Sequence, residues 1–209
     1  MNNGDIMKEN VILMFPQSIY VSEHKHEVTE KEFDYISDLP TRNNGPANSV
    51  TLSDQVLEAE QLKNIKDFCQ KNIEQYAYEV LCIKKDIEFY ITQSWANYSK
   101  KGQFHPQHRH NNSIISAVFY VTQVKDSPIR FFKEENSLFP LDLRYSQYNK
   151  LNSSEITLSL EEGRVIAFPS KLLHGVDSNP NDKERISISM NTFIKGQLGD
   201  IDTKTGLKL

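Results

Sequence analysis

The sequence predicts a mainly β protein, a sandwich or barrel of short strands that follows one long helix. Apolar residues recur at intervals of three and four over residues 62–80, which is the helical period. After residue 86, short runs rich in β-branched and aromatic residues are separated by Gly, Pro, Asn and Asp. This spacing is typical of strands that form a sandwich or close into a barrel.

The expected elements follow from these two patterns. The helix spans residues 54–81, with Ser53 as its N-cap. Strands are expected over residues 87–98, 113–123, 129–132, 155–160, 164–168 and 186–194. Before the helix, residues 11–22 predict a strand broken by Pro16, and the polar residues 23–50 predict a loop with one helical turn.

One domain is expected, because no internal repeat, long linker or low-complexity tract divides the 209 residues. Residues 1–84 would supply the N-terminal strands and a support helix, and residues 85–209 would form the β core. Residues 1–10 are expected to be poorly ordered. The long connection over residues 125–151 is expected to close over a substrate as a lid.

The charge balance excludes some partners. The formal net charge is −4 and the pI is near 5.9, so no overall basic field exists to hold nucleic acid or an anionic membrane. The apolar stretch over residues 11–15 is far shorter than the roughly 20 residues that cross a bilayer. We therefore expect a cytoplasmic protein without a membrane or nucleic-acid partner.

Cysteine usage restricts the metal chemistry. The chain has two cysteines, Cys69 and Cys82, without CxxC spacing, and Cys69 falls on the apolar stripe of the expected helix. Any metal ion would therefore need nitrogen and oxygen ligands. Six histidines are available: His24, His26, His105, His108, His110 and His174.

Three of these histidines lie within six residues, between two expected strands. On an extended segment, residues i and i+2 project to the same side, so His108 and His110 can present two imidazoles to one ion. His105 would point away from them. The alternative is a solvated polar loop, since His24 and His26 have the same spacing and no assigned chemistry.

A second motif follows about 60 residues later. A strand ends at Phe168, the chain turns at Pro169, and His174 lies on the next extended stretch. Arg185 then interrupts an apolar alternation, with Ser187 on the same face. A guanidinium inside a barrel is costly unless an anion meets it, and a small dicarboxylate would satisfy it. The alternative is a surface strand with a salt-bridged arginine.

Together these segments resemble the 2-oxoglutarate/iron(II) oxygenases, and more closely the oxygenase branch found in marine bacteria and their phages. The matching segments are residues 94–97, His108-x-His110 with 113–121, 168–176, 185–193 and 195–199. The resemblance covers residues 85–209 well and the N-terminal part loosely. The resemblance implies a double-stranded β-helix, a cupin-like jelly roll with an N-terminal helix packed on its sheet. It also implies Fe(II), the cosubstrate 2-oxoglutarate and O2.

The resemblance implies a role for each metal-site histidine. The family binds iron through a His-x-Asp/Glu pair and a distal His. His108 matches the first ligand and His174 the distal one. His110 stands where the carboxylate is expected, so either three imidazoles bind the metal or His110 does not ligate. Three histidines suit iron(II) and also zinc.

The resemblance also implies the cosubstrate residues. Arg185 and Ser187 match the pair that binds the far carboxylate of 2-oxoglutarate. Tyr120 is expected to meet the same carboxylate, and Asn97 and Tyr98 are weaker candidates. No acid or base beyond the metal ligands is required.

The implied activity is that of an Fe(II)/2-oxoglutarate-dependent dioxygenase, which hydroxylates an unidentified small-molecule or protein substrate and releases succinate and CO2. A homodimer would add a second copy of the chain as partner. Two alternatives are a non-catalytic cupin-like metal- or ligand-binding module and a zinc hydrolase. Glu161 and Glu162 are interpreted as a solvated turn, and Trp95 as core packing in preference to lining a substrate pocket.

Overall fold

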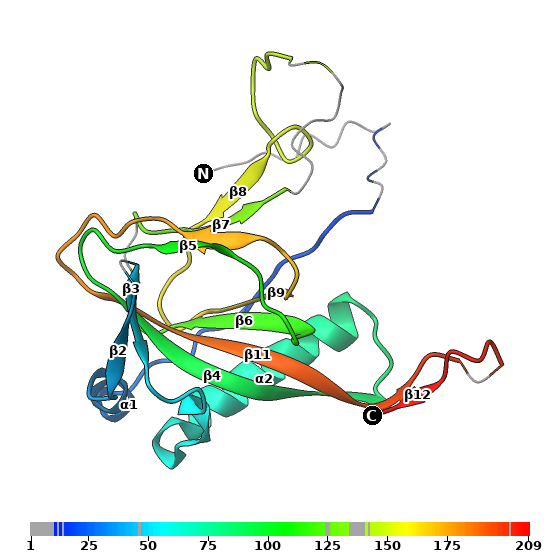
Figure 1. Ribbon diagram of the computed structural model, residues 1–209, viewed down its shortest axis with the longest axis horizontal. Helices are drawn as coiled ribbons and strands as arrows, with labels where there is room; N and C mark the ends of the chain where they lie inside the picture. Colours follow the sequence, from blue (N-terminus) through cyan, green and yellow to red (C-terminus); the bar gives the residue numbers. More distant parts are fainter. Residues whose placement is uncertain are drawn as a thin grey trace.

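The computed structural model describes residues 11, 13, 15–45, 47–123, 126–133, 141, 143–200 and 202–209. Residues 1–10, which we expected to be poorly ordered, lie outside the described residues. Two antiparallel sheets face each other, the smaller above the larger in Figure 1. The expected mainly β class and the double-stranded β-helix are confirmed.

Sheet topology is as follows. The larger sheet has eight strands, ordered β1 (Tyr20–Val21), β9 (Val165–Pro169), β6 (Ile115–Tyr120), β11 (Arg185–Leu198), β4 (Ile87–Ser99), β3 (Asn48–Thr51) and β2 (Thr41–Asn44), with β12 (Leu207–Lys208) paired to β11. The smaller sheet has four strands, ordered β5 (His105–His108), β10 (His174–Val176), β7 (Ile129–Phe132) and β8 (Glu155–Leu158).

The expected helix over 54–81 is divided. Two short 3₁₀ helices, η1 (Val56–Glu58) and η2 (Glu60–Leu62), precede α2 (Lys63–Gln75), and a π-helical turn, η3 (Tyr76–Val80), follows it. Ser53 is not the N-cap, because its hydroxyl accepts a hydrogen bond from the Gln55 N–H in a local turn. Ala59 then adopts an extended conformation that interrupts the helix.

The segment 23–50 is more ordered than predicted. It contains α1 (Glu30–Ser37) and the hairpin of β2 and β3, where we expected a loop with one helical turn. Thr29 caps α1: its side chain accepts from the Glu32 N–H, and the Glu32 carboxylate accepts from the Thr29 N–H. This capping box is a Thr-x-x-Glu pattern that the sequence contains.

Strand alternation gives the larger sheet two different faces. On β11, Ile186, Ile188 and Met190 join the main hydrophobic core. The alternate residues, among them Arg185 and Ser187, point to the opposite face, which the smaller sheet covers. On β11, the inner face is therefore polar and the outer face is apolar.

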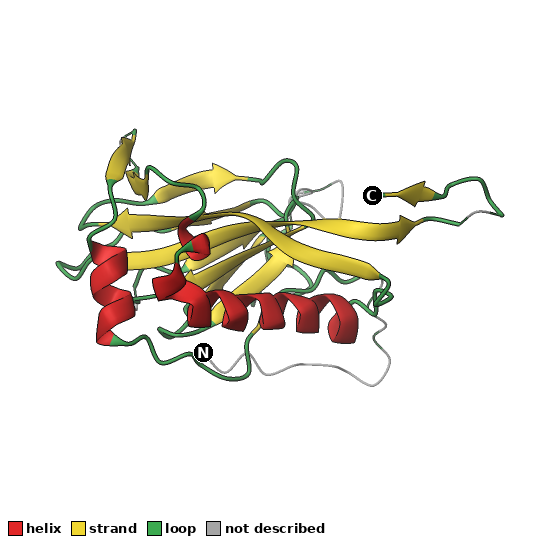
Figure 2. Ribbon diagram, turned by 90° about the horizontal axis from the view of Figure 1, so that it is seen from below, coloured by secondary structure: helices red, strands yellow, loops and turns green. Residues whose placement is uncertain are grey.

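The helix α2 covers the outer face, as Figure 2 shows. Four side chains that lie on its apolar face or just after it, Ile65, Cys69, Ile73 and Tyr76, are fully buried in the core. They pack with the outward residues of β6 and β11, including Phe119 and Ile188. The expected packing of a helix on the sheet and the core position of Cys69 are both confirmed.

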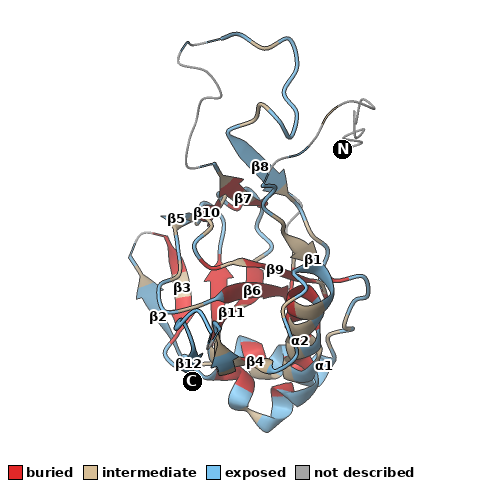
Figure 3. Cartoon of the chain, turned by 90° about the vertical axis from the view of Figure 1, so that its right-hand side faces the viewer, coloured by how far each residue is buried: buried red, intermediate tan, exposed pale blue. Residues whose placement is uncertain are grey.

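Burial differs between the centre of the larger sheet and the edge of the smaller sheet (Figure 3). The central strands β6 and β9 of the larger sheet are buried, whereas the edge strand β8 is largely exposed. The expected lid over 125–151 lies partly outside the described residues, so its role stays a prediction. Among the described residues, no helix is long and apolar enough to cross a membrane.

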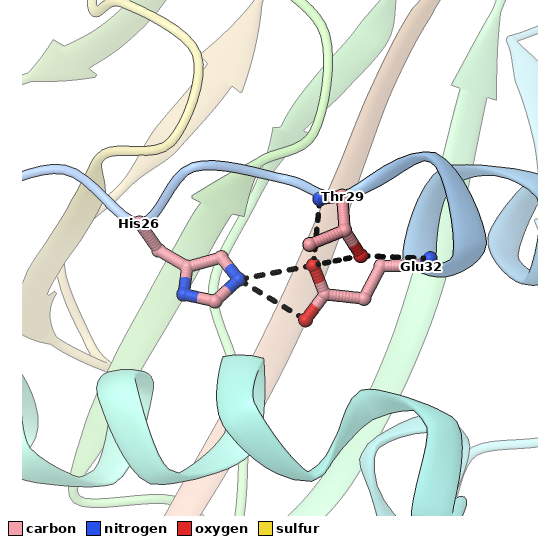
Figure 4. Close-up of polar contacts among 3 residues, drawn as sticks. All are labelled: His26, Thr29 and Glu32. Atoms are coloured by element: carbon pink, nitrogen blue, oxygen red, sulfur yellow. Dashed lines mark hydrogen bonds and ion pairs between the residues drawn. The ribbon is translucent and has the colours of Figure 1, made fainter.

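The His24-Lys-His26 segment has a structural role. The His26 backbone N–H donates to the Gly163 carbonyl, 2.9 Å away, and its Nε2 lies 3.1 Å from both carboxylate oxygens of Glu32. Figure 4 shows these contacts together with the Thr29 cap. The segment therefore fastens the start of α1 to the loop before β9.

Removing the Glu32 charge should destabilise this junction. Burial alone would raise the pKa of Glu32, but hydrogen bonds from Thr29 and His26 outweigh it and lower the pKa. Ionised Glu32 therefore adds stability above its unfolded pKa of about 4.3, and this stability is lost as the pH falls through the folded pKa. We expect Glu32→Gln to lower the free energy of unfolding by about 1–2 kcal/mol at pH 7.

Urea denaturation of the wild type and the variant at pH 7 and near pH 3.5 measures this difference. The two curves should converge at the lower pH. Glu30→Gln is the control, because Glu30 is exposed in the same helical turn. A constant difference across both pH values would contradict the assignment.

Candidate metal and cosubstrate site

Three histidines converge between the sheets. His108 ends β5 and His174 begins β10, and their Cα atoms are directly paired across the two strands. His110 follows β5 and returns to the same place, with its Nε2 3.3 Å from the Nε2 of His174. The ligand nitrogens of all three lie within 4.8 Å of one another. One metal ion can therefore contact all three.

Backbone carbonyls fix how two of these rings face. The Nδ1 of His108 donates to the Pro106 carbonyl, and the Nδ1 of His174 donates to the Leu172 carbonyl, both at 2.8 Å. Because Nδ1 carries the proton, Nε2 keeps its lone pair for a metal. The rings are therefore oriented as ligands before a metal binds.

The cluster is partly shielded from water, since His174 is buried and His108 and His110 are half-buried. The rings of Phe168 and Phe131 lie 4.7 and 6.0 Å from the ring of His174. Burial, with a smaller effect of His108, lowers the pKa of His174 to about 3 and that of His110 to about 4. Burial also lowers the pKa of His108. All three are neutral near pH 7, which is the form that binds metals.

Metal binding should therefore displace few protons. At pH 6, three imidazoles with the ordinary pKa of about 6.5 would together release roughly two protons. Because the pKa values of these histidines are lowered, we expect metal binding at pH 6 to release far fewer than two protons. Calorimetric titration with Ni(II) in buffers of different ionisation enthalpy counts the protons. Release of about two protons would show that the free imidazoles titrate as if exposed.

The predicted cosubstrate residues lie together on the inner face of the larger sheet. The strand register places Ser187 beside Tyr120 on one side and beside Asn97 on the other. Arg185 is the first residue of β11, one inward position before Ser187. Its guanidinium carbon lies 5.4 Å from the centre of the Tyr120 ring.

Arg185 is a buried cation without an anion. Its side chain is only 3% exposed, and no carboxylate among the described residues forms an ion pair with it. Within the same part of the chain, neither its Nε nor the Tyr120 hydroxyl has a hydrogen-bond partner. Burial lowers the pKa of Arg185, but a guanidinium stays protonated in proteins. An anionic ligand would satisfy both groups, so they fit a dicarboxylate.

The two weaker candidates differ. Asn97 faces the site, but its amide donates to Ser189 at 3.0 Å and accepts from Asn48 at 3.4 Å. Its role in cosubstrate binding stays a prediction. Tyr98 points to the other face, where its hydroxyl donates to the Ile36 carbonyl in the core. Strand alternation thus places Tyr98 outside the site, contrary to our expectation.

Two further side chains depart from the sequence interpretation. His105 was expected to point away, yet its ring centre lies 4.5 Å from that of His108. Burial first, and then the charges of His108 and Arg185, lower the pKa of His105 to about 4. Trp95 was expected in the core, but it is half-buried on the inner face, 5.7 Å from the ring of His110. Trp95 therefore lies beside the histidine cluster and outside the core, and whether it lines a substrate pocket stays a prediction.

The paired carboxylates at the start of the 163–176 motif are surface groups, as expected. Glu161 forms an ion pair with Lys25 at 2.8 Å, and Glu162 forms one with Lys183 at 3.6 Å. All four side chains are well exposed. These residues therefore form a solvated turn and take no part in the metal site.

The fold is a double-stranded β-helix, and three histidines within it could hold one metal ion. Residues 93–191, which include the three histidines and Arg185, match the family model described as "Putative 2OG-Fe(II) oxygenase". This match covers just under half of the chain, and over this segment the chain is similar to the 2OG-Fe(II) oxygenases. No curated protein sequence matches it.

Solved structures share the fold. A 2OG-Fe(II) oxygenase family oxidoreductase from Burkholderia pseudomallei has a TM-score of 0.54 at 13% identity, over 77% of this chain and 76% of that one. HygX from Streptomyces hygroscopicus, with nickel and 2-oxoglutarate bound, has a TM-score of 0.58 at 11% identity, over 84% and 82%. A Pseudomonas putida prolyl-4-hydroxylase has 0.53 at 12% identity, over 84% and 92%.

The single tryptophan offers a direct probe of the metal site. Because Trp95 is the only Trp in the chain and lies beside His110, Ni(II) bound at the histidines should quench the intrinsic fluorescence. We expect saturation at one equivalent in the wild type and a weaker titration in His110→Ala. His24→Ala, which changes an exposed histidine, is the control. An unchanged midpoint in His110→Ala would show that His110 is not a ligand.

Proposed function

We propose that His108, His110 and His174 hold Fe(II), and that Arg185, Ser187 and Tyr120 bind the far carboxylate of 2-oxoglutarate. The enzyme then hydroxylates a small-molecule or protein substrate and releases succinate and CO2. The observation that carries this proposal is the buried, unpaired guanidinium of Arg185 on the same inner face as three converging imidazoles. A metal site that served structure alone would not need that cation.

The residues fit the implied metal and cosubstrate. Three nitrogen donors suit Fe(II), and a buried cation with a neighbouring free hydroxyl suits a carboxylate. When bound, Fe(II) and 2-oxoglutarate supply the redox chemistry that divides O2 between succinate and the hydroxylated product. The chain's own residues orient and shield these groups, and no side chain is assigned as acid or base.

The net charge of the metal site depends on which residues bind the metal. Two histidines and a carboxylate would offset one unit of the metal charge, whereas three neutral imidazoles offset none. The Fe(II) site is then one unit more positive, which favours a dianionic cosubstrate. Arg185 places a second positive charge at the far end of that cosubstrate, so both ends of the ligand meet a cation.

Each residue around the histidines has a proposed share in the function. Arg185 neutralises and orients the distal carboxylate, and the Tyr120 hydroxyl donates a hydrogen bond to it. Phe131 and Phe168 keep water from His174. Trp95 forms the wall beside His110. It is paired with Ser189 of β11, which lies two inward positions beyond Arg185 on that strand. The substrate is proposed to approach from this end.

The zinc hydrolase alternative has less support. The group of possible metal ligands found among the described residues contains histidines alone, so no carboxylate belongs to it as a candidate general base. Zinc can still occupy three histidines in the isolated protein. Metal analysis after purification, followed by reconstitution with Fe(II), separates occupancy from function.

The finer assignments are proposals that follow from the sequence. They comprise a cytoplasmic location, membership of the marine bacterial and phage branch, and a homodimer. The net charge of −4 supports a substrate other than nucleic acid.

Anaerobic titration of the Fe(II)-bound protein with 2-oxoglutarate tests the proposed function. A visible metal-to-ligand charge-transfer band should appear in the wild type. Arg185→Ala should raise the Kd for 2-oxoglutarate by about 30-fold or more, because it removes one partner of a buried charge pair. His174→Ala should lose the metal and therefore the band.

Arg42→Ala is the matched control, since Arg42 is an exposed arginine on the edge strand β2. Its titration should equal that of the wild type. A wild type that binds Fe(II) and gives no band would overturn the proposed function and favour the metal-binding module.

A further inference from the structure

The strand β5 carries a histidine that neither the metal site nor the arginine pair uses. His105 begins this strand, and its ring stands beside the ring of the metal-site residue His108, with centres 4.5 Å apart. No described residue forms a hydrogen bond with the His105 ring. Its N–H is therefore available to a ligand.

An irregularity in β5 explains why His105 faces the site. His108 on β5 is paired with His174 on β10, and His105 is paired with Val176. The segment of β5 between these pairs is one residue longer than the segment of β10, so the register shifts. One extra residue on β5 turns positions 105 and 108 to the same side. The intervening Pro106 and Gln107 are exposed. Bulges often re-aim side chains beside active sites in this way.

The neighbouring strand is adapted to this bulge. A Cβ atom added at Gly175 would lie 3.1 Å from the His105 carbonyl oxygen and 3.3 Å from the Gln107 nitrogen. These distances are tighter than ordinary van der Waals contact, so a side chain at position 175 would push β5 away. Glycine lets the bulged strand approach β10 closely and fixes the direction of His105.

His105 lies near both parts of the proposed site. On one side it meets His108 of the metal cluster, and the charge of Arg185 also acts on it. A 2-oxoglutarate molecule that reaches from the metal to Arg185 has to pass between these two groups. An imidazole N–H without a partner among the described residues would then lie within reach of the ligand's carboxylates.

We propose that His105 donates a hydrogen bond to a carboxylate oxygen of bound 2-oxoglutarate. It is then a further cosubstrate contact beside Arg185 and Tyr120. This inference rests on the proposed function. It differs from a role as fourth metal ligand, because the converging ligand nitrogens belong to His108, His110 and His174. It also differs from a role in which His105 would bind a ligand in the hollow of about 420 Å³, which His105 and Gln107 both line.

Three variants separate these roles. His105→Phe keeps a ring of similar size and removes the N–H donor, whereas His105→Gln keeps an N–H donor. Gln107→Ala is the control, because it alters an exposed residue of the same strand that lines the same hollow. Circular dichroism and thermal melting confirm that each variant is folded.

The measurement is the anaerobic titration with 2-oxoglutarate, preceded by a titration with Fe(II). We expect His105→Phe to raise the Kd for 2-oxoglutarate roughly tenfold, as for loss of a charge-assisted hydrogen bond. The Kd for Fe(II) should not change. His105→Gln should recover a substantial part of the affinity, and Gln107→Ala should equal the wild type.

Two outcomes would overturn the inference alone. If the wild type shows the band and His105→Phe binds 2-oxoglutarate equally well, His105 does not contact the cosubstrate. If His105→Phe weakens Fe(II) binding as much as 2-oxoglutarate binding, His105 acts as a metal ligand. Absence of the band in the wild type is a different result, because it overturns the proposed function itself.

Discussion

The buried positive charge of Arg185 is the constraint on which the interior of this protein depends. A guanidinium that is 3% exposed and lacks an ion-pair partner among the described residues destabilises the fold until an anion reaches it. The Tyr120 hydroxyl beside it is also unpaired within the described chain. An anionic ligand would satisfy both groups, which supports the proposed cosubstrate role of Arg185 and Tyr120.

Because side chains alternate along each strand, one face of the sheet packs into the core and the other carries the polar residues of the proposed site. On β11, Ile186, Ile188 and Met190 pack into the core under α2, while Arg185 and Ser187 face the other sheet. A shift of one residue in register would exchange the two sets, burying the arginine against the helix. The long pairing of β11 with β4, from Arg185 to Gly196, holds the register and therefore holds the site.

The smaller sheet contributes the metal-binding side chains with little freedom. His108 and His174 face each other across paired strands, and backbone carbonyls two residues earlier in the chain hold both Nδ1 protons. The bulge in β5 adds His105 to the same side. Because these positions depend on backbone hydrogen bonds and a glycine contact, the geometry exists before a metal arrives.

The sequence by itself determined which residues were candidates for the site. The spacing of His108 and His110, the later His174 and the charge at Arg185 predicted a metal and anion site, because residue type and strand period are local properties. Only the tertiary structure decided the rest. The side-chain direction of His105 depends on a bulge set by β10, and the contact of Trp95 with His110 joins residues from different strands. The division of the helix at Ala59 and the core position of Tyr98 likewise follow from packing between distant segments, which no local pattern records.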